Sequence, residues 1–259
     1  MKPVDVVMLT KNSEHLLEKC LTSVFENVLV KRLIVVDGSS TDNTLKIMDK
    51  FNRKYGNVEI LTENGSRATA RERGIQAVET DWFMFADSDM ILCKDWFKRT
   101  EKHIEEDVGA VWGLNIDVIP NVKSKFFLKL LVLVARECFN LRGGMHDTII
   151  RRKVVEDIRI PKELHAYEDA YIINWIKKKG YRAVIGDDIY CLHYRPSEDW
   201  SIRESISLAA LEIKCGLVYS HIFRYIFYYP FFIYYWFLQL GAKNFGKLFS
   251  QKSKPKMVR

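Results

Sequence analysis

Short apolar runs alternate with amphipathic segments along the first 120 residues of the chain. The apolar runs are rich in β-branched and aromatic residues and lie at Val4–Leu9, Leu33–Val36, Val58–Leu61 and Trp82–Ala86. The segments between them, Glu14–Asn27, Asn43–Lys54 and Ser66–Glu79, have the length and apolar spacing of helices that connect parallel strands. This pattern predicts an α/β sheet, mostly parallel, with helices on both faces because its strands are apolar almost throughout.

The remainder of the chain up to residue 215 has a less regular pattern. A helix is predicted near Lys94–Glu106 and a strand near Val108–Ile119, followed by an amphipathic helix over residues 122–136. A Gly-Gly loop then leads into a strand within residues 142–152. Ala166–Lys179 predicts a helix that ends at Gly180, and Tyr181–Ile185 and Ile189–His193 predict short strands. Glu198–Cys215 predicts one more helix.

The stretch Leu217–Leu240 stands out by its aromatic content. Twelve of its 24 residues are aromatic, and Arg224 is its only charged residue. A buried core helix is one interpretation, but the enrichment in Tyr and Trp favours a membrane interface. Because its uncharged part, Tyr225–Leu240, is shorter than the roughly 20 residues that a spanning helix needs, we expect an interfacial or re-entrant helix.

Charge and composition narrow the class of protein further. The chain is 48% hydrophobic and 28% charged, which indicates a folded protein rather than a disordered one. Its net charge of +7 is concentrated after Glu212, where eight cations and no anion follow. Because this basic tail follows an aromatic segment, we expect it to bind an anionic membrane surface rather than nucleic acid. The five cysteines contain no CxxC pair and no signal-peptide pattern opens the chain, so we expect the cytoplasmic side of the membrane.

Acidic residues follow two of the predicted strands. Asp87-Ser88-Asp89 comes directly after Trp82–Ala86, and Asp37 follows Leu33–Val36. Two carboxylates at this spacing can approach one hard cation that neutralises a diphosphate, and open α/β sheets bind ligands at the carboxyl ends of their strands. A loop turn or a helix cap is the alternative explanation without a ligand. Neither GxGxxG nor GxxxxGK[ST] occurs, which argues against a dinucleotide dehydrogenase and a P-loop NTPase.

Six short motifs occur in a fixed order within residues 4–92. They are Thr10-Lys11-Asn12, residues 35–42 around Asp37, Asn64-Gly65, Ala70-Arg71, Gly74-Ile75 and Phe85-Ala86-Asp87-Ser88-Asp89. In this order and spacing they resemble the nucleotide-binding half of family 2 glycosyltransferases of the GT-A fold. The resemblance implies a Rossmann-like, mixed and mostly parallel sheet and a nucleotide-sugar donor.

The resemblance also implies roles for individual residues. Asp37 contacts the nucleoside and Arg71 lies near the nucleotide. The pair Asp87 and Asp89 contacts the ribose, Asp87 being a substrate contact, and holds Mg²⁺ or Mn²⁺ on the sugar diphosphate. Thr10, Asn12, Glu14 and Ser88 are further expected substrate contacts. The chain departs from the family pattern at two positions, because Ser13 stands where Glu is frequent and Glu72 stands where Asn is usual.

Three more candidates come from the second half of the chain. Glu168-Asp169 opens a predicted helix, as the acceptor-site Glu-Asp pair of the family does, which implies Glu168 as a substrate contact and Asp169 as the general base. A first-turn acid favoured by the helix dipole is the alternative for Asp169. His193, at a strand end, is a further metal ligand in many relatives, with a buried, hydrogen-bonded histidine as the alternative. Arg195 is a candidate partner for a substrate phosphate.

Together these features predict a metal-dependent, inverting glycosyltransferase. Residues 1–120 would form the nucleotide-sugar-binding half and 121–215 the acceptor half, and 216–259 a tail in peripheral or re-entrant contact with the membrane. The expected acceptor is a hydroxyl of a lipid-linked saccharide or polysaccharide, with a polyprenyl (dolichyl) phosphate as the alternative. A sugar nucleotidyltransferase and a non-catalytic nucleotide-sugar-binding module are the alternatives from other classes. A sugar nucleotidyltransferase normally has a Gly-rich loop where this chain has Thr10–Ser13. A non-catalytic module would not need the full set of acidic residues that this chain has.

Overall fold

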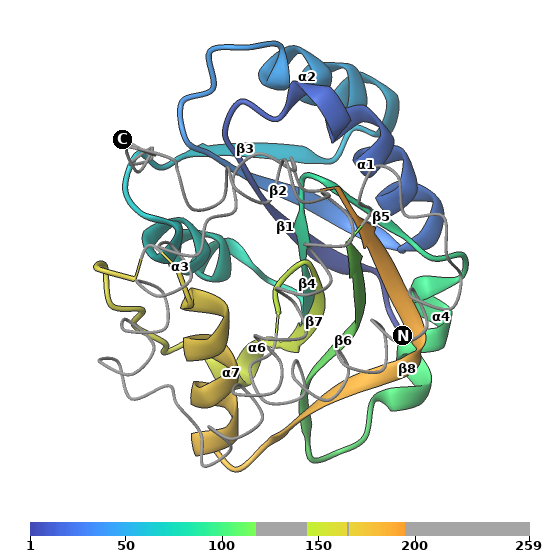
Figure 1. The fold of residues 1–259 in the computed structure, drawn as a ribbon, viewed down its shortest axis with the longest axis vertical. Coiled ribbons are helices and arrows are strands. Elements are labelled where there is room, and N and C mark those ends of the chain that lie inside the picture. The colour runs from blue at the N-terminus through green and yellow to red at the C-terminus, as the bar shows by residue number, and fades with distance from the viewer. Residues whose placement is uncertain (118–143, 165, 195–259) are drawn as a thin grey trace, which may run out of the picture. The chain divides into compact units, whose positions relative to one another are not determined.

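The computed structural model describes residues 1–117, 144–164 and 166–194 (Figure 1). Several predictions lie outside these residues: the helices at 122–136 and 198–215, the aromatic segment Leu217–Leu240, the basic tail and Arg195. Among the described residues, no helix is both long enough and apolar enough to cross a membrane.

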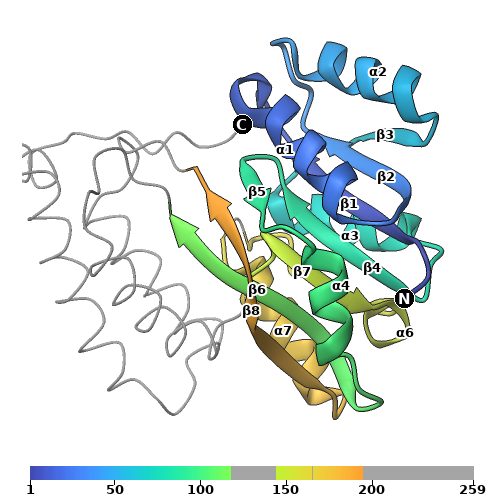
Figure 2. The ribbon, with the colours of Figure 1, turned by 90° about the vertical axis from the view of Figure 1, so that its right-hand side faces the viewer.

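A mixed eight-stranded sheet organises the described residues. Its strands are β1 (Val4–Thr10), β2 (Val30–Asp37), β3 (Val58–Thr62), β4 (Trp82–Asp87), β5 (Met90–Leu92), β6 (Val108–Asp117), β7 (Asp147–Arg151) and β8 (Arg182–His193). They are arranged in the order β3-β2-β1-β4-β7-β6-β8-β5. The first four strands are parallel, and β7 runs antiparallel to both β4 and β6. β6 and β8 lie side by side in the same direction (Figure 2), and β5 is antiparallel to β8.

Helices cover both faces of this sheet, as the apolar strands predicted. They are α1 (Glu14–Asn27), α2 (Thr44–Tyr55), α3 (Arg67–Ala77), α4 (Trp96–Thr100) with a 3-10 turn (Glu101–His103), α6 (Arg152–Val155) and α7 (Glu168–Lys178). Figure 1 shows α1 and α2 on one side of the parallel strands and α3 on the other. Successive residues of β1 point to opposite faces, because Met8 belongs to the same buried cluster as Leu17 of α1, whereas Val7 belongs to the cluster that contains Ala68 of α3.

Gly74 allows α3 to lie close against the sheet. A Cβ atom at this position would be 2.4 Å from Cγ1 of Val7 in β1, so a larger residue would force the helix away. Arg71 lies one turn earlier on the same helix, and its place beside the end of β4 depends on this close packing. Gly74 thus influences the candidate site indirectly, through the position of α3 and of Arg71.

The structure differs from the predicted elements in several places, and the short helix α6 is one element that was not predicted. The two strands expected at 181–185 and 189–193 form one continuous strand, β8. Its pairing register with β6 shifts between Ile185 and Tyr190. The helix expected at 94–106 is shorter, because only Trp96–His103 is helical. The short strand β5 has no counterpart in the prediction.

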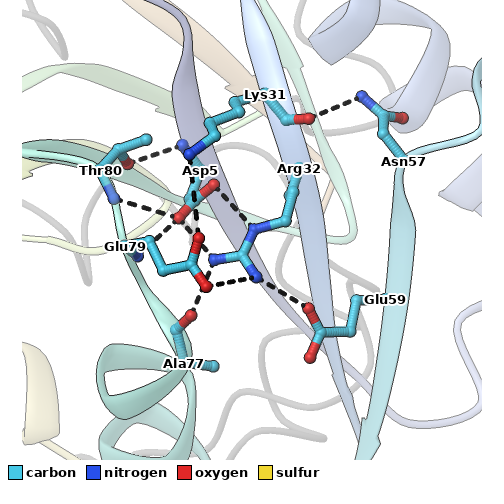
Figure 3. A network of polar contacts seen from close by, with 8 residues as sticks. All are labelled: Asp5, Lys31, Arg32, Asn57, Glu59, Ala77, Glu79 and Thr80. Carbon is cyan, nitrogen blue, oxygen red and sulfur yellow. Dashed lines mark hydrogen bonds and ion pairs between the residues drawn. The ribbon is translucent and has the colours of Figure 1, made fainter.

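An ion pair between the buried Asp5 and the partly exposed Arg32 lies at the edge of the sheet opposite the carboxyl ends of the parallel strands (Figure 3). The fully buried Asp5 carboxylate accepts hydrogen bonds from Nη2 of Arg32 at 2.9 Å and from the backbone N–H of Glu79 at 2.8 Å. Burial by itself raises the pKa of Asp5. The hydrogen bonds from Arg32, Glu79 and Thr80 together outweigh burial, so the pKa of Asp5 lies below its ordinary value. The pair joins β1 and β2 to the connection between α3 and β4.

Substituting Arg32 should therefore destabilise the protein strongly. In Arg32→Leu the Asp5 charge stays buried without its cation, and we expect the free energy of unfolding to fall by about 3–5 kcal/mol in urea titrations at pH 7. Lys31→Ala removes an exposed cation from the same strand, 3.9 Å from Glu79, and should change stability by no more than about 0.5 kcal/mol. Equal effects of the two substitutions would contradict a structural role for the buried pair.

Candidate active site

Asp37 ends β2 as a buried carboxylate that the neighbouring loops hold in place. Its Oδ1 accepts hydrogen bonds from Oγ1 of Thr10 at 2.8 Å and from Oγ of Ser40 at 2.6 Å, and its Oδ2 accepts one from the Ser40 backbone N–H at 2.8 Å. Carboxylates have about four acceptor sites, so Oδ2 retains capacity for one more donor. A ribose hydroxyl or a base N–H can use that capacity.

Asn12 connects the loops that follow β1 and β2. It has a φ of 51°, in the left-handed region that Asn tolerates well, and its Oδ1 accepts a hydrogen bond from the Thr41 backbone N–H at 2.8 Å. Its own N–H donates to Oγ of Ser40 at 2.9 Å. Thr10 and Asn12 are thereby brought to one edge of the sheet together with Asp37, which lies more than 20 residues later in the sequence.

Glu14 has hydrogen bonds to the start of α2. Its Oε2 accepts from the backbone N–H of Asn43 at 2.9 Å and from Nδ2 of Asn43 at 2.7 Å, while its own N–H donates to Oδ2 of Asp42 at 3.1 Å. The side chain thus satisfies a donor at a helix N-terminus. Its predicted contact with the nucleoside stays a prediction.

Arg71 links two acidic residues that lie about 80 residues apart in the sequence, Asp87 and Glu168. Its buried guanidinium donates from Nη2 to Oδ1 of Asp87 at 2.8 Å, and its Nε is 3.8 Å from Oε1 of Glu168. The group also lies over the Phe85 ring, 4.6 Å from the centroid. Nε and Nη1 are buried and have no hydrogen-bond partner among the described residues, so these donors are available to a ligand with acceptor oxygens.

The two carboxyl groups beside Arg71 differ in their pKa. Burial raises the pKa of Asp87, but the charges of Arg71, His193 and His146 outweigh burial and lower it to about 2. Burial, followed by the charge of Asp169, raises the pKa of Glu168 to about 7 against the weaker opposing effect of Arg71. At neutral pH, Asp87 is therefore an anion that can bind a cation, whereas Glu168 is close to half-protonated.

The pKa of Glu168 predicts how stability depends on pH. A carboxyl whose pKa rises on folding contributes stability that is complete below its unfolded value near 4.5 and is lost as the pH rises through about 7. We therefore expect the free energy of unfolding of the wild-type protein to fall between pH 5 and pH 7.5 relative to Glu168→Gln. Glu156→Gln, at an exposed glutamate, should leave that pH profile unchanged, and parallel profiles for wild type and Glu168→Gln would contradict the assigned pKa.

Asp87, Asp89 and His193 form a cluster at the end of β4 and the end of β8. Their ligand-type atoms all lie within 4.8 Å of one another, and Nε2 of His193 is 3.0 Å from Oδ1 of Asp89. The antiparallel pairing of Met90 with His193 and a hydrogen bond from the Tyr194 N–H to the Asp89 carbonyl at 2.9 Å bring the two segments together. Two carboxylates and one imidazole are ligands that suit a divalent cation such as Mn²⁺.

The remaining predicted residues lie close to these groups in the chain. Oγ of Ser88 donates to Oγ of Ser13 at 3.0 Å, which joins the acidic loop to the loop after β1. Asp169 begins α7 beside Glu168, and its Oδ1 accepts the Ala170 N–H at 2.7 Å. Their roles toward a substrate stay predictions.

A second cluster, His146, Asp147 and Cys191, was not among the predicted residues. All three are buried. The sequence gives little indication of it, because a single His-Asp pair in an apolar strand is compatible with many core arrangements.

The comparison with protein families matches residues 5–158 to the family described as "Glycosyl transferase family 2". The chain belongs to glycosyl transferase family 2. This assignment confirms the family resemblance of the sequence motifs and, at the level of the family, the prediction of an enzyme that uses a nucleotide-sugar.

Two curated relatives come from bacilli. The chain is 26% identical over 217 residues to the minor teichoic acid biosynthesis protein GgaB of Bacillus subtilis, a match that covers 76% of this chain and 23% of GgaB. It is 27% identical over 214 residues to the poly(ribitol-phosphate) beta-glucosyltransferase of Bacillus spizizenii, which covers 77% of this chain and 33% of that protein. The family 2 chain thus spans about a quarter to a third of the length of these relatives.

A solved structure supports the fold. The mannosyltransferase PcManGT of Pyrobaculum calidifontis, in complex with GDP-Man and Mn²⁺, matches with a TM-score of 0.60 and 18% identity, over 77% of this chain and 59% of PcManGT. At this level of identity, the likeness shows that the two chains share a fold. The mixed α/β sheet predicted for a GT-A protein is therefore confirmed for the described residues.

Proposed function

We propose that this chain is a metal-dependent, inverting glycosyltransferase that moves a sugar from a nucleotide-sugar to a hydroxyl of a saccharide acceptor. The observation that carries the proposal is the cluster of Asp87, Asp89 and His193 beside Arg71, in a chain of glycosyl transferase family 2. The bound GDP-Man and Mn²⁺ of PcManGT support the proposal, since that protein has the same fold.

The donor site is assigned to the carboxyl ends of β1, β2 and β4. Asp37 would accept a hydrogen bond from the nucleoside, and its fixed orientation keeps the cost of ordering low. A divalent cation held by Asp87, Asp89 and His193 supplies charge neutralisation for the departing nucleoside diphosphate. Arg71 adds a fixed positive charge and two nitrogens, Nε and Nη1, that have no hydrogen-bond partner among the described residues and could donate to phosphate oxygens.

The acceptor side is assigned to the start of α7. Asp169 would remove the proton from the attacking hydroxyl, and attack from the face opposite the leaving group inverts the anomeric centre. Glu168 precedes Asp169 in the sequence, and its Oε1 is 3.8 Å from Nε of Arg71. Its raised pKa allows it to donate a hydrogen bond near neutral pH. The separation of the two roles follows from their environments, because at neutral pH Asp87 is an anion whereas Glu168 is partly protonated and is a weaker partner for a cation.

The finer features of the function rest on the sequence and on the relatives. The Bacillus spizizenii relative is named a poly(ribitol-phosphate) beta-glucosyltransferase, which supports a polymeric acceptor. For this chain we propose a hydroxyl of a polysaccharide or lipid-linked saccharide. The division into a transferase domain, 1–215, and a tail, 216–259, that associates with the cytoplasmic face of a membrane is part of the same proposal.

A donor panel tests this proposal. UDP-, GDP- and dTDP-sugars are added to the purified chain with Mn²⁺ or with EDTA, and the thermal unfolding midpoint is measured. A ligand at 100 times its Kd stabilises the folded state by about 2.7 kcal/mol, so one nucleoside class should raise the midpoint by several degrees with Mn²⁺ and much less with EDTA. Absence of stabilisation by every donor would contradict the proposal.

A further inference from the structure

The buried cluster of His146, Asp147 and Cys191 lies beside the candidate cation site without belonging to it. The ligand-type atoms of the three residues are all within 4.8 Å of one another. His146 precedes β7, Asp147 begins β7, and Cys191 belongs to β8. Such a set could bind a second metal or could support the first site.

The contacts of Asp147 favour the supporting role. Its fully buried carboxylate accepts hydrogen bonds from Nε1 of Trp96 at 2.8 Å and from the Gly113 N–H at 3.3 Å. Its Oδ1 is also 2.5 Å from Nδ1 of His146, a close polar contact between the two side chains. Tetrahedral zinc would hold the same two atoms about 3.4 Å apart. Asp147 is thus fixed by α4 and β6, and it fixes the His146 ring in turn.

His146 contacts both strands that supply the candidate cation ligands. Its carbonyl oxygen accepts the Asp87 N–H at 3.0 Å, and its ring centroid is 6.5 Å from that of His193. Its Nδ1 is 3.3 Å from Sγ of Cys191, two residues before His193 on the same face of β8. The residue therefore lies between Asp87 and His193.

This position matters because β4 and β8 are not neighbours in the sheet. β7 and β6 separate them, so the backbone ladders connect the end of β4 to the end of β8 only indirectly, through two intervening strands. Asp89 and His193 are tied through β5, but Asp87 precedes β5 and lacks that tie. His146 provides a direct connection between Asp87 and the face of β8 that carries His193.

We propose that His146, oriented by Asp147, is a positioning residue that holds Asp87 and His193 at the separation required to bind one divalent cation. The inference rests on the proposed function, because it presupposes a cation at Asp87, Asp89 and His193. Groups that orient metal ligands typically contribute about 10- to 100-fold to metal affinity.

The test is the Mn²⁺ dissociation constant, measured without turnover by the EPR signal of free Mn²⁺. His146→Phe keeps a ring beside His193 but loses the contact with Asp147, and we expect Mn²⁺ binding about 10-fold weaker. His146→Asn places a nitrogen near the Nδ1 position and should recover part of the affinity. Ile149→Val, a core substitution in the same strand, should lower the thermal midpoint of the metal-free protein while leaving Mn²⁺ affinity unchanged.

Three results would overturn the inference alone, provided that wild-type protein binds Mn²⁺ and Asp89→Ala does not. They are wild-type Mn²⁺ affinity in His146→Phe, an equal loss of affinity in Ile149→Val, and a thiolate-to-Co²⁺ absorption band in Co²⁺-loaded protein that Cys191→Ser removes. The last result would mean that the cluster itself binds metal. If the wild-type protein binds no Mn²⁺ at all, the proposed cation site fails and the inference fails with it.

Discussion

Asp89→Ala should reduce sugar transfer by at least about 10²- to 10³-fold while leaving the protein folded. The Asp89 side chain is 38% exposed to solvent, so truncating it should leave no sizeable cavity in the core. The cation would lose a charged ligand, and with it the stabilisation of the leaving diphosphate. The measurement is kcat/KM with the donor selected by the panel and saturating Mn²⁺, together with the thermal midpoint of the variant.

Asp95→Asn is the matched control for this substitution. It also removes one negative charge from an exposed aspartate, six residues further along the chain, and should change kcat/KM by less than about twofold. Wild-type activity in Asp89→Ala would remove Asp89 from the cation site. Unfolding of Asp89→Ala at ordinary temperatures would instead assign it the structural role of a turn residue.

Asp169→Asn should reduce transfer to a saccharide hydroxyl by about 10²-fold or more. A hydroxyl is almost neutral at pH 7 and needs a base within hydrogen-bond reach as it attacks. The amide keeps the shape of the side chain and can still accept the Ala170 N–H, so the start of α7 should remain intact. Donor binding, measured as Mn²⁺-dependent thermal stabilisation, should be unchanged because the defect concerns the acceptor.

The same variant distinguishes the two acceptor classes. A phosphate monoester is largely ionised at pH 7, since its second pKa is about 6, and needs little proton removal. Transfer to a polyprenyl phosphate should therefore tolerate Asp169→Asn and suffer from Arg195→Ala, which removes a candidate phosphate partner. Asp157→Asn, at another exposed acid, serves as the control. Full activity of Asp169→Asn toward a saccharide hydroxyl would exclude Asp169 as the base.

The nucleotide-binding half of the fold could be predicted from local patterns. Helix α1 has the bounds that its periodicity indicated, and α2 and α3 differ from the predicted bounds by one or two residues. These elements alternate regularly and have clear end signals, such as the left-handed Gly56 after α2. The order of motifs then brought Asp37, Asp87 and Asp89 to the carboxyl edge of one sheet, where parallel strands of an α/β protein meet.

Features defined by distant partners could not be predicted in the same way. β5 has three residues, too few to show a period, and exists through its pairing with β8 about 100 residues later. The direction of β7 depends on its insertion between β4 and β6, which no local pattern records. The contact between His146 and Asp87 is a consequence of that insertion. The raised pKa of Glu168 likewise depends on its burial in the folded protein, which outweighs the opposing charge of Arg71 from a helix almost 100 residues earlier.

The metal-dependent release of nucleoside diphosphate tests the central claim most directly. Purified chain, the selected nucleotide-sugar and a saccharide acceptor are incubated with Mn²⁺ or with EDTA, and free nucleoside diphosphate and glycosylated acceptor are quantified together. The proposed function predicts equal amounts of the two products with Mn²⁺, and neither product with EDTA or with Asp89→Ala. Equal product formation with Mn²⁺ and with EDTA would contradict a role for the cation, and release of pyrophosphate in place of nucleoside diphosphate would contradict glycosyl transfer itself.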